Sequence, residues 1–214
     1  MIMIRLSLFF VVQLILSQSL SAQVELEFIQ PDVVQNDVSL DLAFAGGINS
    51  AQYQTIDLDG DDDLDLVLFD RSSDKINCFE NLGNNYSYQP AFEFLFPENI
   101  QHWMVLSDYD CDGRKDLFTY TGQGIRVFRN NQSGNSIEWI ETANPLKTFG
   151  SSSLINLLFN PTDIPSITDL DGDGDLDILV FDFASSSQIE FHQNHAVENT
   201  GSCGLDFVRE TRAY

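Results

Sequence analysis

Short apolar runs and acidic loops alternate along residues 43–194 of this 214-residue chain. Three runs are apolar at nearly every consecutive position, which is typical of strands that are buried on both faces. They occupy residues 66–69, 117–120 and 178–181. Small polar turns follow each run, and a second apolar segment follows each turn, at residues 76–81, 125–130 and 189–194. The pattern predicts three β-hairpins of similar construction.

Each hairpin is preceded by an Asp-rich loop, so the repeating unit is loop, strand, turn and strand. The copies read DLDGDDDLDLVLF, DYDCDGRKDLFTY and DLDGDGDLDILVF, and they begin at Asp57, Asp108 and Asp169. Further extended segments are expected at 92–96 and 137–142, and no amphipathic helix of useful length is visible. A period of roughly 50 residues fits a four-stranded propeller blade. The predicted fold is therefore all-β, with three blades of an incomplete β-propeller and four antiparallel strands in each blade.

Aspartate alternates with other residues inside each loop, at loop positions 1, 3, 5 and 9. Hard cations such as Ca²⁺ take six to eight oxygen ligands, and alternating carboxylates on a tight loop can converge on one ion. Position 7 varies in chemistry, which suits a ligand supplied by its backbone carbonyl. The candidate metal ligands are Asp57, Asp59, Asp61, Asp63 and Asp65; Asp108, Asp110, Asp112, Arg114 and Asp116; and Asp169, Asp171, Asp173, Asp175 and Asp177. We expect about three Ca²⁺ ions, one per loop.

Two other interpretations of the loops are an EF-hand and a metal-free acidic turn. An EF-hand carries a bidentate Glu at position 12, ahead of a second helix. Here position 12 is Leu68, Thr119 or Val180, which cannot ligate, and a strand is expected next. The second interpretation is an acidic surface turn without metal. In that case four or more carboxylates would repel one another at close range, and burial would raise their pKa values.

The overall charge excludes one class of function. Ten Lys and Arg residues stand against 33 Asp and Glu residues, a formal net charge of −23. Nucleic-acid binding is not expected, because it needs clustered basic side chains. A disordered acidic tail is also excluded, because 43% of the residues are hydrophobic and 17 are Phe.

Residues 1–22 have the pattern of a secretory signal peptide: one charge at Arg5, an apolar run from Leu6 to Leu16, and small residues before the expected cleavage after Ala22. The apolar run is too short to span a bilayer, so no transmembrane segment is expected after cleavage. Secretion to an extracellular or cell-surface location permits one disulfide among Cys78, Cys111 and Cys203, in any of three pairings.

The D-x-D-x-D-G-x-x-D loops, the Leu/Ile-rich strands and the I-x-V-F-x-N strand together resemble FG-GAP/VCBS repeats, the blades of calcium-binding propellers such as integrin α-subunit heads. The stretches LAFAGGINSAQYQTIDLDGDDDLDLVLFDR and NPTDIPSITDLDGDGDLDILVFDF are similar to secreted VCBS-repeat proteins of Bacteroidetes. The resemblance implies that calcium is held by the side chains at positions 1, 3, 5 and 9 and by the position 7 carbonyl. Loop one departs from the family pattern at Asp62, where Gly is usual.

The repeats divide the chain into a signal peptide, a strand segment and three blades. The expected ranges are 1–22 for the signal peptide, 23–46 for the N-terminal strand segment, and 47–100, 101–160 and 161–214 for the blades. Three blades cannot close a ring, and family propellers commonly have about seven. We therefore expect an N-terminal fragment, with the remaining blades in the missing C-terminal part.

No nucleophile elbow, HExxH motif or Gly-rich phosphate loop occurs in the sequence. The expected function is a non-catalytic module for adhesion, ligand binding or scaffolding, with an unidentified extracellular protein or glycan as partner. The alternative is a propeller that serves as scaffold or accessory domain of a secreted polysaccharide-degrading enzyme. The Phe and Trp residues lie mostly at strand positions and are expected in the core, and a sugar-stacking patch of Trp103, Tyr86 and Tyr88 is the alternative.

Overall fold

The computed structural model describes residues 29, 31–40, 42–134, 136–184 and 187–211. The chain divides into two units between Pro31 and Asp32, and the second contains all the elements below. The predicted signal peptide lies outside the described residues. Within the predicted strand segment 23–46, β1 (Val34–Gln35) and β2 (Val38–Ser39) form a small antiparallel hairpin.

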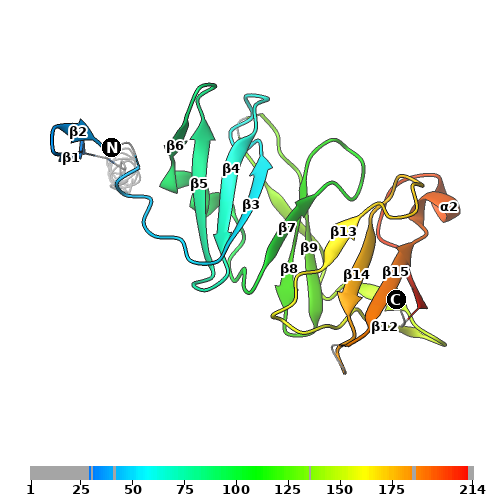
Figure 1. The fold of residues 1–214 in the computed structure, drawn as a ribbon. Coiled ribbons are helices and arrows are strands. Elements are labelled where there is room, and N and C mark those ends of the chain that lie inside the picture. The colour runs from blue at the N-terminus through cyan, green and yellow to red at the C-terminus, as the bar shows by residue number, and fades with distance from the viewer. Residues whose placement is uncertain (1–28, 30, 41, 135, 185–186, 212–214) are drawn as a thin grey trace, which may run out of the picture. The chain divides into compact units, whose positions relative to one another are not determined.

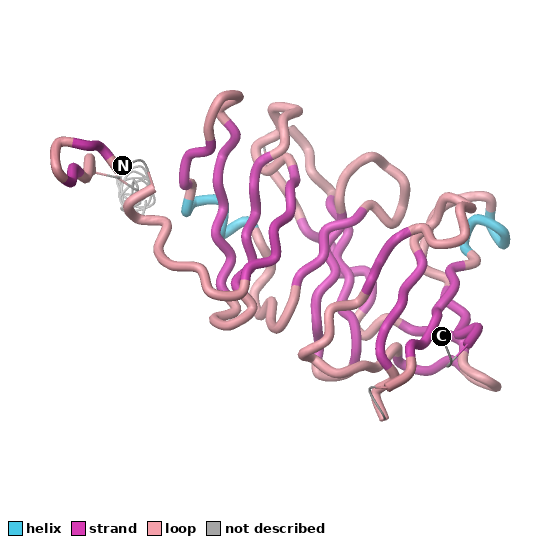
Figure 2. The backbone as a smooth tube through the Cα atoms, viewed as in Figure 1, coloured by secondary structure: helices cyan, strands magenta, loops and turns pink. Residues whose placement is uncertain are grey.

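Three β-sheets form the body of the second unit, and Figures 1 and 2 show them in succession along the chain. The first sheet has the order β3 (Ala51–Ile56), β4 (Asp65–Asp70), β5 (Lys75–Asn81) and β6 (Tyr86–Tyr88). The second has the order β7 (Met104–Ser107), β8 (Asp116–Thr121), β9 (Gly124–Asn130) and β10 (Trp139–Ala143). Both sheets are antiparallel throughout, which confirms the prediction of four-stranded, blade-like units.

The third sheet contains the same four-stranded unit and two additional strands. Its unit is β13 (Ser166–Thr168), β14 (Asp177–Phe181), β15 (Ile189–Asn194) and β16 (Phe207–Thr211). The additional hairpin of β11 (Lys147–Phe149) and β12 (Leu154–Asn156) pairs with β16 through a parallel β11–β16 contact. This hairpin precedes the predicted blade boundary at residue 161, yet it belongs to the third sheet.

Strand β8 is buried on both faces, as predicted for all three apolar runs, because it lies between two neighbouring sheets. In β14 only one face is buried, by the second sheet, and Phe181 on the other face is 44% exposed. One core cluster joins the first and second sheets and includes Val67, Phe69 and Leu117. A second cluster joins the second and third sheets and includes Phe118 and Ile178. Leu117 and Phe118 are adjacent in β8 and have no solvent exposure, so β8 serves both cores with alternate side chains.

One predicted strand is a helix instead. The segment 92–96 was expected to be extended, but Pro90–Leu95 forms the 3₁₀ helix η1, with Pro near its start. Proline lacks a backbone N–H and fixes φ, so it favours the first turn of a helix over a place in a sheet ladder. The other predicted segment, 137–142, overlaps β10 and is confirmed. The only α-helix among the described residues is the short α2 (Ala196–Thr200).

The three Asp-rich loops occupy corresponding places, because each connects the first strand of a four-stranded unit to the second. Figure 1 shows them at the same end of their sheets, with the hairpin turns at the opposite end.

A disulfide joins Cys111 in the second loop to Cys203, beyond α2, and leaves Cys78 buried as a free thiol. Among the described residues, no helix is long and apolar enough to cross a bilayer.

Replacement of Gly124 by Ala should destabilise the fold by about 3 kcal/mol or more. Gly124 has φ of +135°, and a Cβ atom there would lie 2.4 Å from the backbone oxygen of Leu157. Gly122, in the same turn, has open space around the corresponding position. Gly122→Ala is therefore the control and should change the unfolding free energy by less than about 0.5 kcal/mol. Equal denaturant midpoints for the two variants would contradict this packing.

Replacement of both Cys111 and Cys203 by Ser should lower the unfolding free energy by up to about 4–5 kcal/mol, because the disulfide spans 92 residues and restricts the unfolded chain. Thiol titration of the wild-type protein provides the independent check. We expect no reactive thiol in the folded protein and one, from Cys78, after denaturation. Three reactive thiols after denaturation without reductant would show that the disulfide is absent.

Candidate metal centre

The last Asp of each loop ties the loop to the sheet. Asp65, Asp116 and Asp177 are almost completely buried, and each begins the second strand of its unit. One carboxylate oxygen accepts from the N–H at loop position 2, at 2.9–3.0 Å. The other accepts from a backbone N–H at the end of the next strand, at 2.8–2.9 Å. These bonds fix the end of every loop in the same way.

The first Asp of each loop shapes the turn itself. Asp57 accepts from the N–H groups of Gly60 and Asp62, at 2.6 and 3.2 Å. Asp108 accepts from Asp112 and Gly113, and Asp169 accepts from Gly172 and Gly174. The backbone turns through positive φ in all three loops, and Asp62 adopts φ of +71° where the family pattern has Gly. Asp is among the residues that tolerate this conformation, so loop one keeps its turn.

An asparagine in each repeat completes the structure, and our sequence reasoning assigned it no role. Asn81, Asn130 and Asn194 end the second hairpin strand. Each donates from its side-chain Nδ2 to the carbonyl at loop position 8, at 3.2 Å. Each also accepts, at its side-chain oxygen, a backbone N–H two residues further on. The final Asn of the I-x-V-F-x-N pattern was the available signal.

The predicted ligand residues converge in part. In each loop three carboxylates offer oxygen atoms that all lie within 4.8 Å of one another. Two oxygens bound to one Ca²⁺ at about 2.4 Å can be at most about 4.8 Å apart, so these sets fit a shared ion. The sets are Asp57, Asp59 and Asp61; Asp108, Asp110 and Asp116; and Asp169, Asp171 and Asp177. Asp65, Asp112 and Asp173 at the remaining predicted positions lie outside these three-residue sets.

Several carboxylate oxygens in the loops are buried and accept no hydrogen bond. They belong to Asp59, Asp63, Asp110, Asp173 and Asp175. Burial is the main cause that raises the pKa of Asp59 and Asp63, and the Asp61 carboxylate adds to it. Burial also raises the pKa of Asp116 to about 6, against the opposing effect of its two backbone hydrogen bonds. A cation would supply the missing partner for these oxygens and keep the carboxylates charged.

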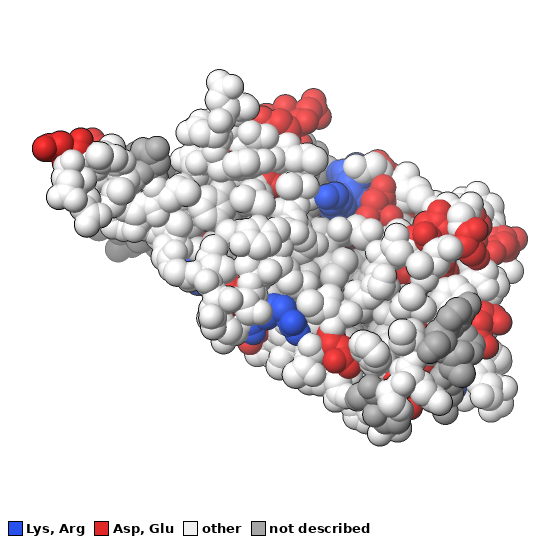
Figure 3. Space-filling view, viewed as in Figure 1, with Lys and Arg blue, Asp and Glu red and all other residues white. Residues whose placement is uncertain are grey.

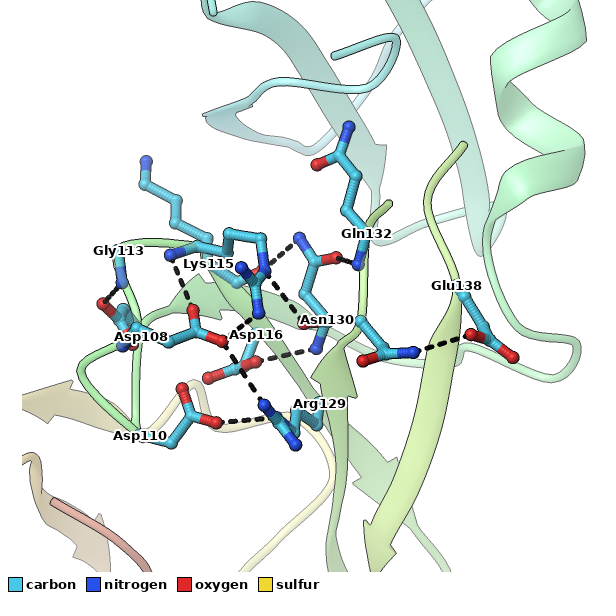
Figure 4. Close-up of polar contacts among 12 residues, drawn as sticks. Asp108, Asp110, Gly113, Lys115, Asp116, Arg129, Asn130, Gln132 and Glu138 are labelled. Carbon is cyan, nitrogen blue, oxygen red and sulfur yellow. Dashed lines mark hydrogen bonds and ion pairs between the residues drawn. The ribbon is translucent and has the colours of Figure 1, made fainter. Parts of the chain in front are cut away.

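Loop two is partly neutralised by the protein's own cations. Arg129 forms an ion pair with Asp110 at 2.7 Å, and Arg114 pairs with Asp112. Figure 4 shows Asp110 beside Arg129, with Asp116 against Asn130. Lys115 turns away from the carboxylates and donates to the Thr55 carbonyl at 2.8 Å. In Figure 3 a small group of basic side chains accordingly interrupts the acidic ones along this edge.

Loop three gains a carboxylate from outside the repeat. Glu198, in α2, joins Asp171 and Asp173 in a second set of oxygens within 4.8 Å. Asp175 reaches the same helix, where it accepts from the Val197 N–H at 3.0 Å. Nothing in the repeat pattern pointed to Glu198, because it lies 21 residues beyond the loop and approaches only through the fold.

The proposed sugar-stacking patch does not exist in the folded chain. Trp103 has no exposed surface and packs on Phe159, with ring centroids 5.7 Å apart. Tyr88 is also buried and donates to Glu93 at 2.8 Å. Of the three residues only Tyr86 is exposed. The core position expected for Trp103 is confirmed, and the alternative patch is wrong because Trp103, directly before β7, and Tyr88, in β6, both lie in the core.

A family model described as FG-GAP-like repeat matches residues 57–119 and 108–180, which together cover more than half of the chain. The chain belongs to the FG-GAP-like repeat family. Each matched segment runs from the first Asp of one loop into the hairpin of the next repeat, so the two segments cover all three loops. FG-GAP-like repeats are generally non-catalytic. Searches of curated proteins and of solved structures found no match to this chain.

Replacement of Asn130 by Ala should destabilise this FG-GAP-like protein by about 2 kcal/mol or more, because the Lys115 carbonyl and the Gln132 N–H lose their buried partner. Asn131→Ala is the control, since its side chain bonds only to Glu138 at the surface among the contacts observed. Its effect should stay within about 0.5 kcal/mol. Chemical denaturation measures both, and similar losses would contradict the role given to Asn130.

Proposed function

We propose that this FG-GAP-like chain is a calcium-stabilised, non-catalytic module of a secreted or cell-surface protein, which works in adhesion, ligand binding or scaffolding. One observation carries the proposal. In each of the three repeats, carboxylate oxygens gather within reach of one ion while buried oxygens among them accept no hydrogen bond. Acidic surface turns without metal have no need to bury unpartnered charge.

Calcium would be held by the side chains at loop positions 1, 3, 5 and 9 and by the backbone carbonyl at position 7, which is Asp63, Arg114 or Asp175. When bound, the ion supplies the positive charge that the clustered carboxylates lack. The protein's own part is to present oxygen ligands on a loop whose two ends are already fixed by Asp and Asn hydrogen bonds. The role of the ion in this proposal is structural, since millimolar extracellular calcium would keep weak sites occupied.

The three loops should differ in affinity. Six Asp residues lie within 57–65 and five within 169–177, with no basic residue in either range. Four Asp residues lie within 108–116, where Arg114 and Lys115 reduce the formal charge to −2. The Arg129–Asp110 ion pair competes further for the ligand oxygens. We therefore expect loop two to bind calcium most weakly.

Secretion is supported by the signal-peptide pattern of residues 1–22 and by the Cys111–Cys203 disulfide, since disulfides persist in oxidising compartments.

A larger propeller is supported by the outer face of the third sheet. Leu179, Phe181, Ile189 and Phe191 occupy positions whose counterparts in the first two sheets pack against the next sheet. Phe181 is 44% exposed, whereas its counterpart Phe69 is completely buried. A further blade would cover this apolar face.

The substitution Asp59→Asn tests calcium binding, because the stability difference between variant and wild type should have opposite signs in EDTA and in calcium. In excess EDTA the variant should be more stable than the wild type, because it removes a half-buried charge that repels Asp57 and Asp61. In excess calcium it should be less stable, because loop one has lost a ligand charge and calcium stabilises only the folded state. Thermal unfolding measures both effects, and calorimetric titration should count about three ions for the wild type.

Glu98→Gln is the matched control, because it removes one exposed acidic charge outside the loops. It should leave the difference between calcium and EDTA unchanged. If Asp59→Asn stabilises the protein equally with calcium and with EDTA, loop one is a metal-free acidic turn. If the wild-type melting midpoint does not respond to calcium, the proposal fails for all three loops.

A further inference from the structure

The third repeat departs from the other two at positions that should be part of a core. The second hairpin strand carries Phe79 in the first repeat and Phe128 in the second, but His192 in the third. The loops of repeats two and three also start 61 residues apart, whereas those of repeats one and two start 51 apart. The longer interval contains the additional hairpin β11–β12. Local exceptions of this kind are most common at functional sites.

The inserted hairpin and the altered strand meet in one buried polar cluster. His192 is 1% exposed, and its Nδ1 lies 3.0 Å from the hydroxyl of Thr148 on β11. Its Nε2 lies 3.4 Å from a carboxylate oxygen of Glu190. Arg209, from β16, donates to the other oxygen of Glu190 at 3.2 Å. Strands β15 and β16 thus hold an imidazole, a carboxylate and a guanidinium in contact, and β11 adds the Thr148 hydroxyl.

Three residues of the cluster line a cavity of about 540 Å³. Leu158 and Phe183 add exposed apolar side chains to the lining. Glu190, His192 and Arg209 all contribute to the lining, while Thr148 does not. A volume of this size, with an apolar wall and a few convergent polar groups, is typical of sites for small molecules or single ligand units.

The charges of the lining select among ligand classes. Glu190 and Asp182 outweigh Arg209, and burial lowers the pKa of His192 and favours its neutral form. An anionic ligand would therefore meet net negative charge. A sugar ring offers hydroxyls that donate and accept without breaking the Arg209–Glu190 pair, and an apolar C–H face that can lie on Phe183.

We propose that this cavity is a binding pocket for one neutral sugar residue of a glycan. The proposal rests on the ligand-binding part of the proposed function and is independent of calcium occupancy. Glu190, His192 and Arg209 hold the hydroxyls, and Phe183 receives the ring. Thr148 is a positioning residue: it is completely buried, outside the lining, and orients the His192 ring. It therefore cannot act as a nucleophile towards a bound sugar.

The test uses the full chain with calcium present and the methyl glycosides of glucose, galactose, mannose and N-acetylglucosamine as probes. Saturation-transfer NMR detects binding, and titration measures affinity. At least one probe should bind the wild type saturably. His192→Phe restores the residue of the other two repeats and should fold normally, yet weaken binding about tenfold or more, and Phe183→Ala should do the same.

Phe181→Ala is the matched control, because Phe181 is a similarly exposed aromatic residue two positions away that does not line the cavity. It should bind the probe as the wild type does. Absence of saturable binding to every probe overturns the proposal, as does undiminished binding by both His192→Phe and Phe183→Ala. Loss in Phe181→Ala at an unchanged melting midpoint would place the site on the outer face of the sheet and also overturn it. The calcium response of the melting midpoint is measured separately, so either idea can fail without the other.

Discussion

A buried carboxylate that accepts hydrogen bonds from two backbone amides is the interaction on which the rest of each repeat depends. Asp65, Asp116 and Asp177 join the start of a loop to the end of the next strand, and each is itself the first residue of the strand between them. Hydrogen bonds to a charged acceptor are stronger than those between neutral groups. Loss of this side chain would leave two buried N–H groups unsatisfied and release the loop from the sheet.

This anchoring brings the loop carboxylates close together, and the repeats differ in how much positive charge the protein places beside them. A loop fixed at both ends forces its remaining carboxylates into a small volume, where repulsion and burial oppose ionisation. In loop two, Arg114 and Arg129 supply part of the missing positive charge from the protein itself. Loops one and three have no such ion pairs among the described residues, and loop three even gains Glu198. Those two loops have the greater need for an external cation.

The stacking of two-faced sheets explains how a chain of small sheets acquires a core. Side chains of β8 alternate between the core towards the first sheet and the core towards the third, so the middle sheet stabilises both neighbours. In the third sheet, β14 has apolar side chains on both faces like β8. On β15, however, His192 stands where the other two repeats have Phe. The β11–β12 hairpin accommodates that exception, because Thr148 provides the hydrogen-bond partner that a buried imidazole requires.

The sequence by itself determined the repeats, the paired apolar strands, the loop positions of the aspartates and the all-β class. These features are local and periodic: strands with apolar residues on both faces and loops with alternating Asp are visible within about a dozen residues. For Asn81, Asn130 and Asn194 the sequence shows only that Asn recurs at the same position of each repeat. Their role is not evident from it, because a hydrogen bond to a loop 15 or more residues away leaves no local pattern.

Only the tertiary structure decided which side chains meet across elements. It selected Cys111–Cys203 from three possible disulfides, brought Arg129 to loop two and Glu198 to loop three, and buried Trp103 and Tyr88. It also attached β11–β12 to the third sheet and thereby formed the cavity around His192. These outcomes depend on how sheets stack and where a connection returns, and composition and spacing do not encode that directly.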